Sequence, residues 1–271
     1  MPAIERPDGA RIHYEVRGGG EPAILLASYW SWIPEVYAEI EDDLAADHRV
    51  ANYHLRGTGE STREGPFDVE TDIGDLEAVA EQVGGPLLLL ATADASNRSV
   101  KLAARRPDLV DGVVCFGAGP FALSQFEGEE GMVTSQTVLD AFVEMVEANF
   151  RSAMRTFMEA TNPQMSEEEL RERVTAQAAF NSEQAPAGRL RGWLADDPRA
   201  AAQATGERLW IFAAADVAGP WLPPPDEVAR ITAETLPKAN VVALEPGPIS
   251  NPGGVAEAIR RIAAGRDPRQ K

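Results

Sequence analysis

The residues that could do chemistry gather where a run of leucines ends in small residues. Leu87–Leu90 is followed by residues 91–96, Ala-Thr-Ala-Asp-Ala-Ser, and then by a segment of helical composition up to Ala104. This pattern is typical of a buried strand, a sharp turn and a helix. Asp94 and Ser96 then lie at the start of the helix, where the helix dipole favours an anion. A carboxylate placed there could bind a cationic group or move a proton.

Two motifs carry a resemblance to a known family. Residues 54–61, His-Leu-Arg-Gly-Thr-Gly-Glu-Ser, match the pattern Asp-x-Arg-Gly-x-Gly-x-Ser at every position but the first. Ala91, Ala93 and Ala95 take the three fixed positions of a Gly-x-Ser-x-Gly nucleophile elbow, counted back from the helix end at Pro107. On these motifs the chain resembles the α/β-hydrolase family over nearly its whole length.

The resemblance implies where a catalytic triad would lie. It puts Ala93, which has no hydroxyl, at the nucleophile position and Asp216 at the position of the triad acid. The loop of residues 246–252, where the family has its catalytic His, contains none. Because a serine-hydrolase mechanism needs a nucleophile, a base and an acid, we do not expect an ordinary serine esterase.

The loop after the strand of residues 22–27 is the second candidate site. The family places a His-Gly pair here, whose loop supplies a backbone amide to the oxyanion hole; Ala27 and Ser28 take those positions. Any residue except proline can supply that amide. Tyr29, Trp30 and Trp32 follow, and these aromatic side chains either line the mouth of a pocket or pack the long loop.

Strands alternating with helices predict an α/β protein with the α/β-hydrolase fold: a mostly parallel eight-stranded sheet, helices on both faces and an inserted helical lid. We expect residues 1–120 and 206–271 to form the core and residues 121–205 to form the lid, after the sixth strand. The lid contains Met154 and Met158, which either line a pocket for an apolar ligand or fill the lid's own core.

The histidines and the single cysteine have structural interpretations. We expect His13 to face solvent on a hairpin strand, His48 to end a surface helix, and His54 to be structural. Cys115 lies in an apolar strand, so we expect a buried thiol. A chain with one cysteine has no internal disulfide and no cysteine metal cluster, and we predict neither a metal nor a cofactor.

Charge and hydropathy exclude several classes of partner. The formal net charge is −18. Nucleic acid and anionic membrane surfaces are therefore not expected partners, because binding phosphate needs a clustered basic surface. Neither a signal peptide nor an apolar run long enough to span a membrane is visible, so we expect a cytoplasmic protein. The oligomeric state stays open.

Three functions remain. The first is non-hydrolytic acid–base chemistry, such as cyclisation, isomerisation or elimination, on a small, largely apolar molecule, with Asp94 and Asp216 as acids or bases and Ser96 or Ser250 as hydroxyl partners. The second is a pseudoenzyme that only binds such a molecule, in which Asp94 caps its own helix. The third shifts the elbow by one residue and makes Asp94 a nucleophile, as in epoxide hydrolases and haloalkane dehalogenases.

Overall fold

The computed structural model describes residues 2–31, 37–117, 119–121, 136–214, 224–244, 247–248 and 250–269. Its centre is an eight-stranded sheet in the order β1-β2-β4-β3-β5-β6-β7-β8. β1, β2 and β4 pair antiparallel, and the other neighbours pair parallel. The strands are β1 (Ala3–Glu5), β2 (Arg11–Gly18), β3 (Ala23–Leu26), β4 (Arg49–Tyr53), β5 (Leu87–Thr92), β6 (Val110–Phe116), β7 (Leu209–Ala213) and β8 (Asn240–Ala243).

The leucine run forms the central strand β5, with a neighbouring strand on each side. Leu87 and Leu89 pack into one apolar core, and Leu88 and Leu90 into a second core on the opposite face. Successive side chains of a strand point to opposite faces, so a continuous apolar run suits a strand that is covered on both. The predicted doubly covered, mostly parallel sheet is thereby confirmed.

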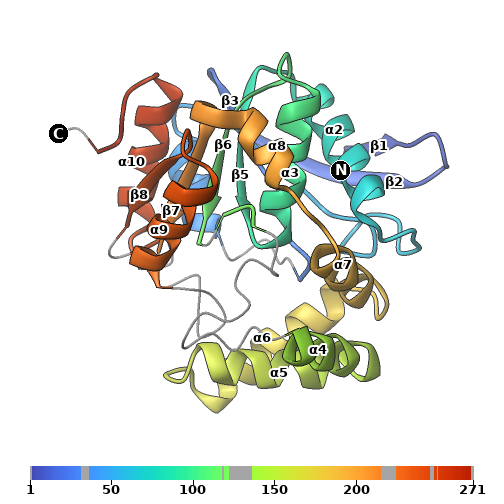
Figure 1. Ribbon diagram of the computed structural model, residues 1–271. Helices are drawn as coiled ribbons and strands as arrows, with labels where there is room; N and C mark the ends of the chain where they lie inside the picture. The colour runs from blue at the N-terminus through green and yellow to red at the C-terminus, as the bar shows by residue number, and fades with distance from the viewer. Residues whose placement is uncertain are drawn as a thin grey trace.

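Helices cover both faces of the sheet (Figure 1). The first core includes apolar side chains of α2, α3, α8 and α9, and the second those of α1 and α10. The helices outside the lid are α1 (Ala38–Leu44), α2 (Val69–Val83), α3 (Asp94–Arg105), α8 (Arg199–Thr205), α9 (Pro225–Thr235) and α10 (Pro252–Ala263).

Four further helices lie between β6 and β7 and form a separate layer below the sheet in Figure 1. They are α4 (Gln136–Ala148), α5 (Phe150–Thr161), α6 (Glu167–Phe180) and α7 (Ala185–Leu194). α8, which falls inside the range 121–205 expected for the lid, lies against α3 instead, and its Ala202 belongs to the sheet's core. We use the word lid below for α4–α7.

Local capping explains where two lid helices begin. α6 begins with a capping box: the Ser166 side chain accepts the Glu169 amide, and the Glu169 side chain accepts the Ser166 amide. Helix α4 ends at Ala148. Asn149 is extended and its side chain accepts the Ser152 amide, so a new helix begins at Phe150.

Candidate functional site

The turn between β5 and α3 has the backbone of a nucleophile elbow, and its tip is Ala93. Ala93 has φ 49° and ψ −133°. Among the described residues it is the only one other than glycine with positive φ. Non-glycine residues avoid this region, and the elbow of the α/β-hydrolase fold is a strained turn of this kind. The strained backbone position of this turn is therefore Ala93 and not Asp94.

Asp94, the first residue of α3, is buried, with 5% of its surface exposed. One carboxylate oxygen accepts the Trp30 amide at 2.9 Å, and the other accepts Nη2 of Arg98 at 2.8 Å. Burial raises the pKa of the Asp94 carboxyl, while Arg98 and the Trp30 amide act in the opposite direction. The cap residue of α3 is Ala93, and no side chain caps the helix. Asp94 thus ties the loop after β3 to the elbow helix.

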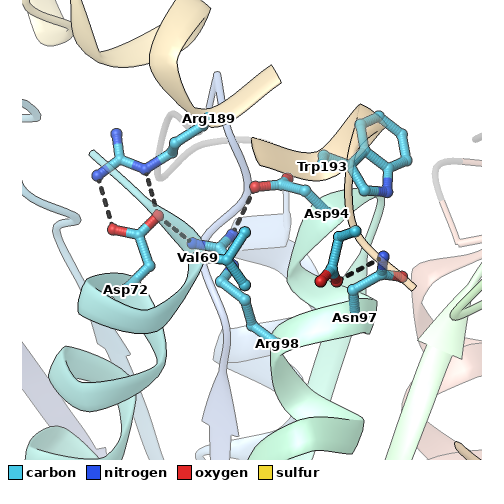
Figure 2. A pocket seen from close by; sticks show the side chains of 8 residues that line it. Val69, Asp72, Asp94, Asn97, Arg98, Arg189 and Trp193 are labelled. Carbon is cyan, nitrogen blue, oxygen red and sulfur yellow. Dashed lines mark hydrogen bonds and ion pairs between the residues drawn. The ribbon is translucent and has the colours of Figure 1, made fainter. Parts of the chain in front are cut away.

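Arg98 binds both α2 and the loop after β3, and through α2 it connects Asp94 to the lid helix α7 (Figure 2). Its Nη1 donates to Asp72 of α2 at 2.9 Å, and its Nη2 also donates to the Ser28 carbonyl at 2.8 Å. Asp72 in turn accepts Nε and Nη2 of Arg189, on α7, at 2.7 and 3.0 Å. We call Arg189, Asp72, Arg98 and Asp94 the charged seam. All four side chains are less than a tenth exposed.

Of the charged seam, only Asp94 is predicted from the sequence; Arg98, Asp72 and Arg189 are not. The spacing of Asp94 and Arg98, four residues apart on one helix, is a signal that could have found that pair. Asp72 lies 117 positions from Arg189 along the chain, so no local pattern announces that contact.

The loop after β3 is held from both sides. Its Ser28 hydroxyl donates to the Tyr53 carbonyl, and its Ser28 carbonyl accepts Arg98. Trp30 is 5% exposed and packs edge-on against Phe142 and Phe157 of the lid, with ring centroids 6.0 and 6.4 Å away. Of the two interpretations of Trp30, the structure favours packing.

Tyr29 is half-buried and lies where the two sheet cores and the lid cluster meet. Burial raises the pKa of its hydroxyl, and the charge of Asp94 raises it further. Tyr29 is therefore a neutral hydroxyl near the elbow at physiological pH.

The two lid methionines have different neighbours. Met154 is 1% exposed and belongs to the apolar cluster that contains Trp30, against which Ala93 packs. Met158 is 8% exposed and packs with Leu170 and Val174 of α6. Met158 thus fills the lid's own core, whereas Met154 lies in the layer between lid and elbow.

The remaining predicted site residues are dispersed. Ser96 is fully buried and lies beside the Cys115 thiol of β6, whose pKa is raised by burial to about 12. Ser250 is exposed. Asp216 lies outside the described residues, so its assignment as triad acid stays a prediction.

The expectations for two histidines were wrong. His13 is 2% exposed, because the loop that follows β4 covers its face of the hairpin; its ring lies 4.6 Å from that of His54. His48 is 7% exposed, and its Nδ1 lies 3.1 Å from the Pro22 carbonyl oxygen. His54 is also buried; its Nδ1 accepts the Glu60 amide at 3.0 Å, in keeping with a structural role.

A cavity of about 10 Å³ lies beside the charged seam, bordered by Asp94, Asn97, Arg98 and Trp193. A more open hollow of about 200 Å³ lies between α4 and α7, lined by Val143 and Leu194 among others. Within the described part of the chain, no three His, Cys, Asp or Glu side chains converge as metal ligands would.

The comparisons with known proteins agree on the fold. No protein-family model matches the chain, and no curated protein matches it. Solved structures do. An esterase from Exiguobacterium antarcticum has a TM-score of 0.80 at 18% identity, over 97% of this chain and 98% of that one. A hydrolase from Oleispira antarctica has a TM-score of 0.78 at 14% identity, over 93% and 94%.

An enol-lactonase from Burkholderia xenovorans LB400 is similar at a TM-score of 0.65 and 20% identity, over 97% of this chain and 98% of that one. These neighbours are α/β-hydrolase-fold enzymes, and the eight-stranded sheet matches theirs: the chain has the α/β-hydrolase fold. At such low identity the likeness is one of fold. No helix in the described ranges is long and apolar enough to cross a membrane.

Proposed function

We propose that this α/β-hydrolase-fold protein has lost the catalytic triad and binds a small, largely apolar molecule beneath its lid without hydrolysing it. The observation that carries the proposal is Ala93 at the strained tip of the elbow. A methyl group there cannot attack a carbonyl, and removing one member of a triad typically lowers the rate by factors of roughly 10⁴ or more.

The contacts of Asp94 support the same proposal. In this fold the loop after β3 supplies an amide to the oxyanion hole. Here the Trp30 amide of that loop donates to Asp94 at 2.9 Å. The Asp94 carboxylate thus occupies one backbone donor of the loop that, in this fold, helps to form the oxyanion hole needed for ester hydrolysis.

The aromatic and methionine side chains between lid and elbow support an apolar ligand. Trp30, Phe142 and Met154 lie in one cluster with Ala93 at its edge. These side chains pack against one another, so a molecule beneath the lid would have to displace part of this packing and would then have apolar surroundings. Apolar surroundings with few polar groups are typical of small-molecule sites.

Non-hydrolytic acid–base catalysis is the second candidate, and the environment of Asp94 favours it. Burial raises the pKa of this carboxyl, a property that catalytic acids share. Its two hydrogen-bond partners count against it as a base, since a base must release them to reach a substrate. The third candidate, Asp94 as a nucleophile, is less supported because Asp94 follows the strained tip and pairs with Arg98.

The test of lost hydrolysis is a panel of activated aryl esters of increasing chain length. The wild type should show no turnover above background, and Ala93→Ser should change little, because an unassisted hydroxyl is a poor nucleophile near pH 7. A wild-type rate comparable to that of working esterases would overturn the proposal.

Binding and catalysis are separated by the fate of the ligand. Small molecules that co-purify with the protein are identified by mass spectrometry and then incubated with it. A binding protein returns the ligand unchanged. Consumption of the ligand, abolished in Asp94→Asn, would establish acid–base catalysis instead.

A further inference from the structure

The loop after β4 holds the end of the lid helix α6. The Gly59 amide donates to the Phe180 carbonyl at 2.8 Å, and the Ser182 amide donates to the Gly57 carbonyl at 2.6 Å. Nη1 of Arg63, further along the loop, donates to the same Phe180 carbonyl at 2.8 Å. Phe180 is the last residue of α6, and α7 begins shortly after it. A change in the conformation of this loop therefore acts directly on the junction of α6 and α7.

His54 holds the turn of this loop in place. Its side chain is buried, and its Nδ1 accepts the Glu60 amide at 3.0 Å. The Phe180 ring packs edge-on against the imidazole, with ring centroids 4.9 Å apart. A backbone amide can only donate, so Nδ1 must carry a lone pair, and the ring proton of neutral His54 must lie on Nε2. This hydrogen bond thus exists only while His54 is uncharged.

Protonation of His54 reverses the chemistry of its Nδ1. The ring nitrogen becomes a donor that faces the N–H of Glu60, so the hydrogen bond is lost and two donors oppose each other. Glu60 directly follows Gly59, whose amide binds the Phe180 carbonyl. A buried imidazolium also needs water or a new acceptor. Water reaches the ring when the loop and Phe180 move apart.

The groups that surround His54 keep its ring neutral at physiological pH. Burial is the main cause that lowers the pKa of His54, to about 4. His13 of β2, whose ring lies 4.6 Å away, acts in the same direction. Glu15 of the same strand and Glu60 of the loop raise the pKa, but they do not outweigh burial. From α6, the uncharged ring of Phe180 faces the imidazole.

We propose that His54 is a pH-sensitive switch of the lid: while its ring is neutral it holds the loop against the end of α6, and its protonation releases α6 and α7 from the loop while the sheet stays folded. Above pH 6.5 the contact is fully in place. It weakens as the pH falls from 6.5 to about 4, because the released ring takes up a proton that the held ring does not. The equilibrium constant for release then rises by up to about 300-fold, tenfold for each unit between the two pKa values. The switch does not depend on the proposed function.

The first test is hydrogen exchange of the full chain, read by mass spectrometry at pH 6.5 and at about pH 4 and corrected for the intrinsic exchange rates. Between these values, peptides of α6 and α7 should lose protection by at least about tenfold in the wild type, whereas peptides of the central strand β5 should keep theirs. An equal loss in β5 would mean global unfolding, and no loss in α6 and α7 would mean that the lid does not respond to pH. Either result overturns the proposal.

Two substitutions of His54 form a matched pair in the same experiment. In His54→Asn an amide oxygen takes the place of Nδ1, so the acceptor for the Glu60 amide remains but does not titrate. In His54→Gln the side-chain amide reaches the place of Nε2, so that acceptor is lost at every pH. We expect the pH-dependent loss of protection in α6 and α7 to disappear in His54→Asn, and protection to be low at both pH values in His54→Gln.

The carboxylates of the charged seam titrate in all three proteins, so they cannot account for a difference between them. A pH dependence in His54→Asn as large as that of the wild type would assign the release to another group. Full protection in His54→Gln would mean that the bond to the Glu60 amide does not hold the lid. Each of these outcomes would refute the switch.

Discussion

Two of the contacts that join the lid to the core in the described part of the chain differ in their chemistry. The charged seam is a chain of buried ion pairs that runs from Arg189 on α7 to Asp94 at the elbow. The second, which we call the backbone seam, joins residues 57–59 of the loop after β4 to residues 180–182 at the end of α6. There the Gly59 amide donates to the Phe180 carbonyl at 2.8 Å, and the Ser182 amide to the Gly57 carbonyl at 2.6 Å.

The glycines of the backbone seam are required by close approach. Gly57 has φ +74°, and a Cβ there would lie 2.5 Å from Cβ of Ala185; Gly59 has φ +46°, and a Cβ there would lie 2.3 Å from Nδ1 of His54. The matching motif therefore serves the lid junction as well as the turn itself.

Only one of these two contacts between lid and core ends at the candidate site. The backbone seam ends in a structural loop, packed on His54, whose ring meets that of Phe180 at 4.9 Å. The charged seam ends on the Trp30 amide and the Ser28 carbonyl, at the candidate site itself. The charged seam is therefore the contact through which a substitution in the lid is expected to affect the candidate site.

Asp72→Ala should have the largest effect, because it leaves Arg98 and Arg189 buried without their shared carboxylate. Removing one partner of a buried pair costs about 3–5 kcal/mol. Urea unfolding measures the loss. The control is Asp75→Ala, one turn along α2, which breaks the buried contact with Arg56.

Both variants should lose stability, but hydrogen exchange should accelerate selectively in α4–α7 only for Asp72→Ala. Identical exchange patterns would mean that the charged seam does not hold the lid.

The second largest effect on stability should come from the titration of His54. Burial, together with the neighbouring His13, lowers the pKa of His54 from 6.5 to about 4. Between these values the unfolded chain binds a proton that the folded chain does not. The stability is thus full above pH 6.5 and falls as the pH drops to about 4, by up to about 3 kcal/mol.

Glu41 acts in the opposite direction, so the His54 effect is read from a difference. Burial raises the pKa of Glu41 from 4.5 to about 7, and its contribution to stability is lost as pH rises through that window. His54→Asn keeps an acceptor for the Glu60 amide and removes the titration. The free energy of unfolding of the wild type, minus that of His54→Asn, should therefore increase from pH 4 to 6.5. A difference that does not change with pH would contradict the low pKa of His54.

Asp94→Asn should cost less than Asp72→Ala, because Arg98 keeps Asp72 and an amide oxygen can still accept the Trp30 amide. We expect a loss of about 1–3 kcal/mol, the range of hydrogen bonds to charged groups. Chemical denaturation measures it. An unchanged midpoint would show that the Asp94–Arg98 pair contributes nothing to the seam.

Ala93→Gly should have the smallest effect and the opposite sign. Strain of a non-glycine residue in a sparsely populated region costs about 1–3 kcal/mol, and glycine removes it at some entropic cost, so we expect a gain of about 1 kcal/mol. Ala95→Gly, two residues on and inside α3, should instead lose about 0.5–1 kcal/mol. Thermal melts measure both variants. A lower melting temperature in Ala93→Gly as well as in Ala95→Gly would contradict strain at Ala93.

Much of the fold could be predicted because its signals are local. The leucine run, the small residues after it and the capping box at Ser166 each specify their own element, and the structure confirms them. The elbow register followed from the spacing of Ala91, Ala93 and Ala95, and the positive φ falls on its middle residue.

The sequence by itself thus determined the mostly parallel sheet and the helical insertion after its sixth strand, since these depend on residue type and near-neighbour spacing. Only the tertiary structure decided what the polar side chains do. His13 is buried because a loop some 40 residues later covers its strand, and Asp72 of α2 pairs with both Arg98 of α3 and Arg189 of α7 because the fold brings these three helices together. The interaction between two charges depends on their separation in space. For residues far apart in the sequence, that separation is set by the tertiary fold and not by any local pattern.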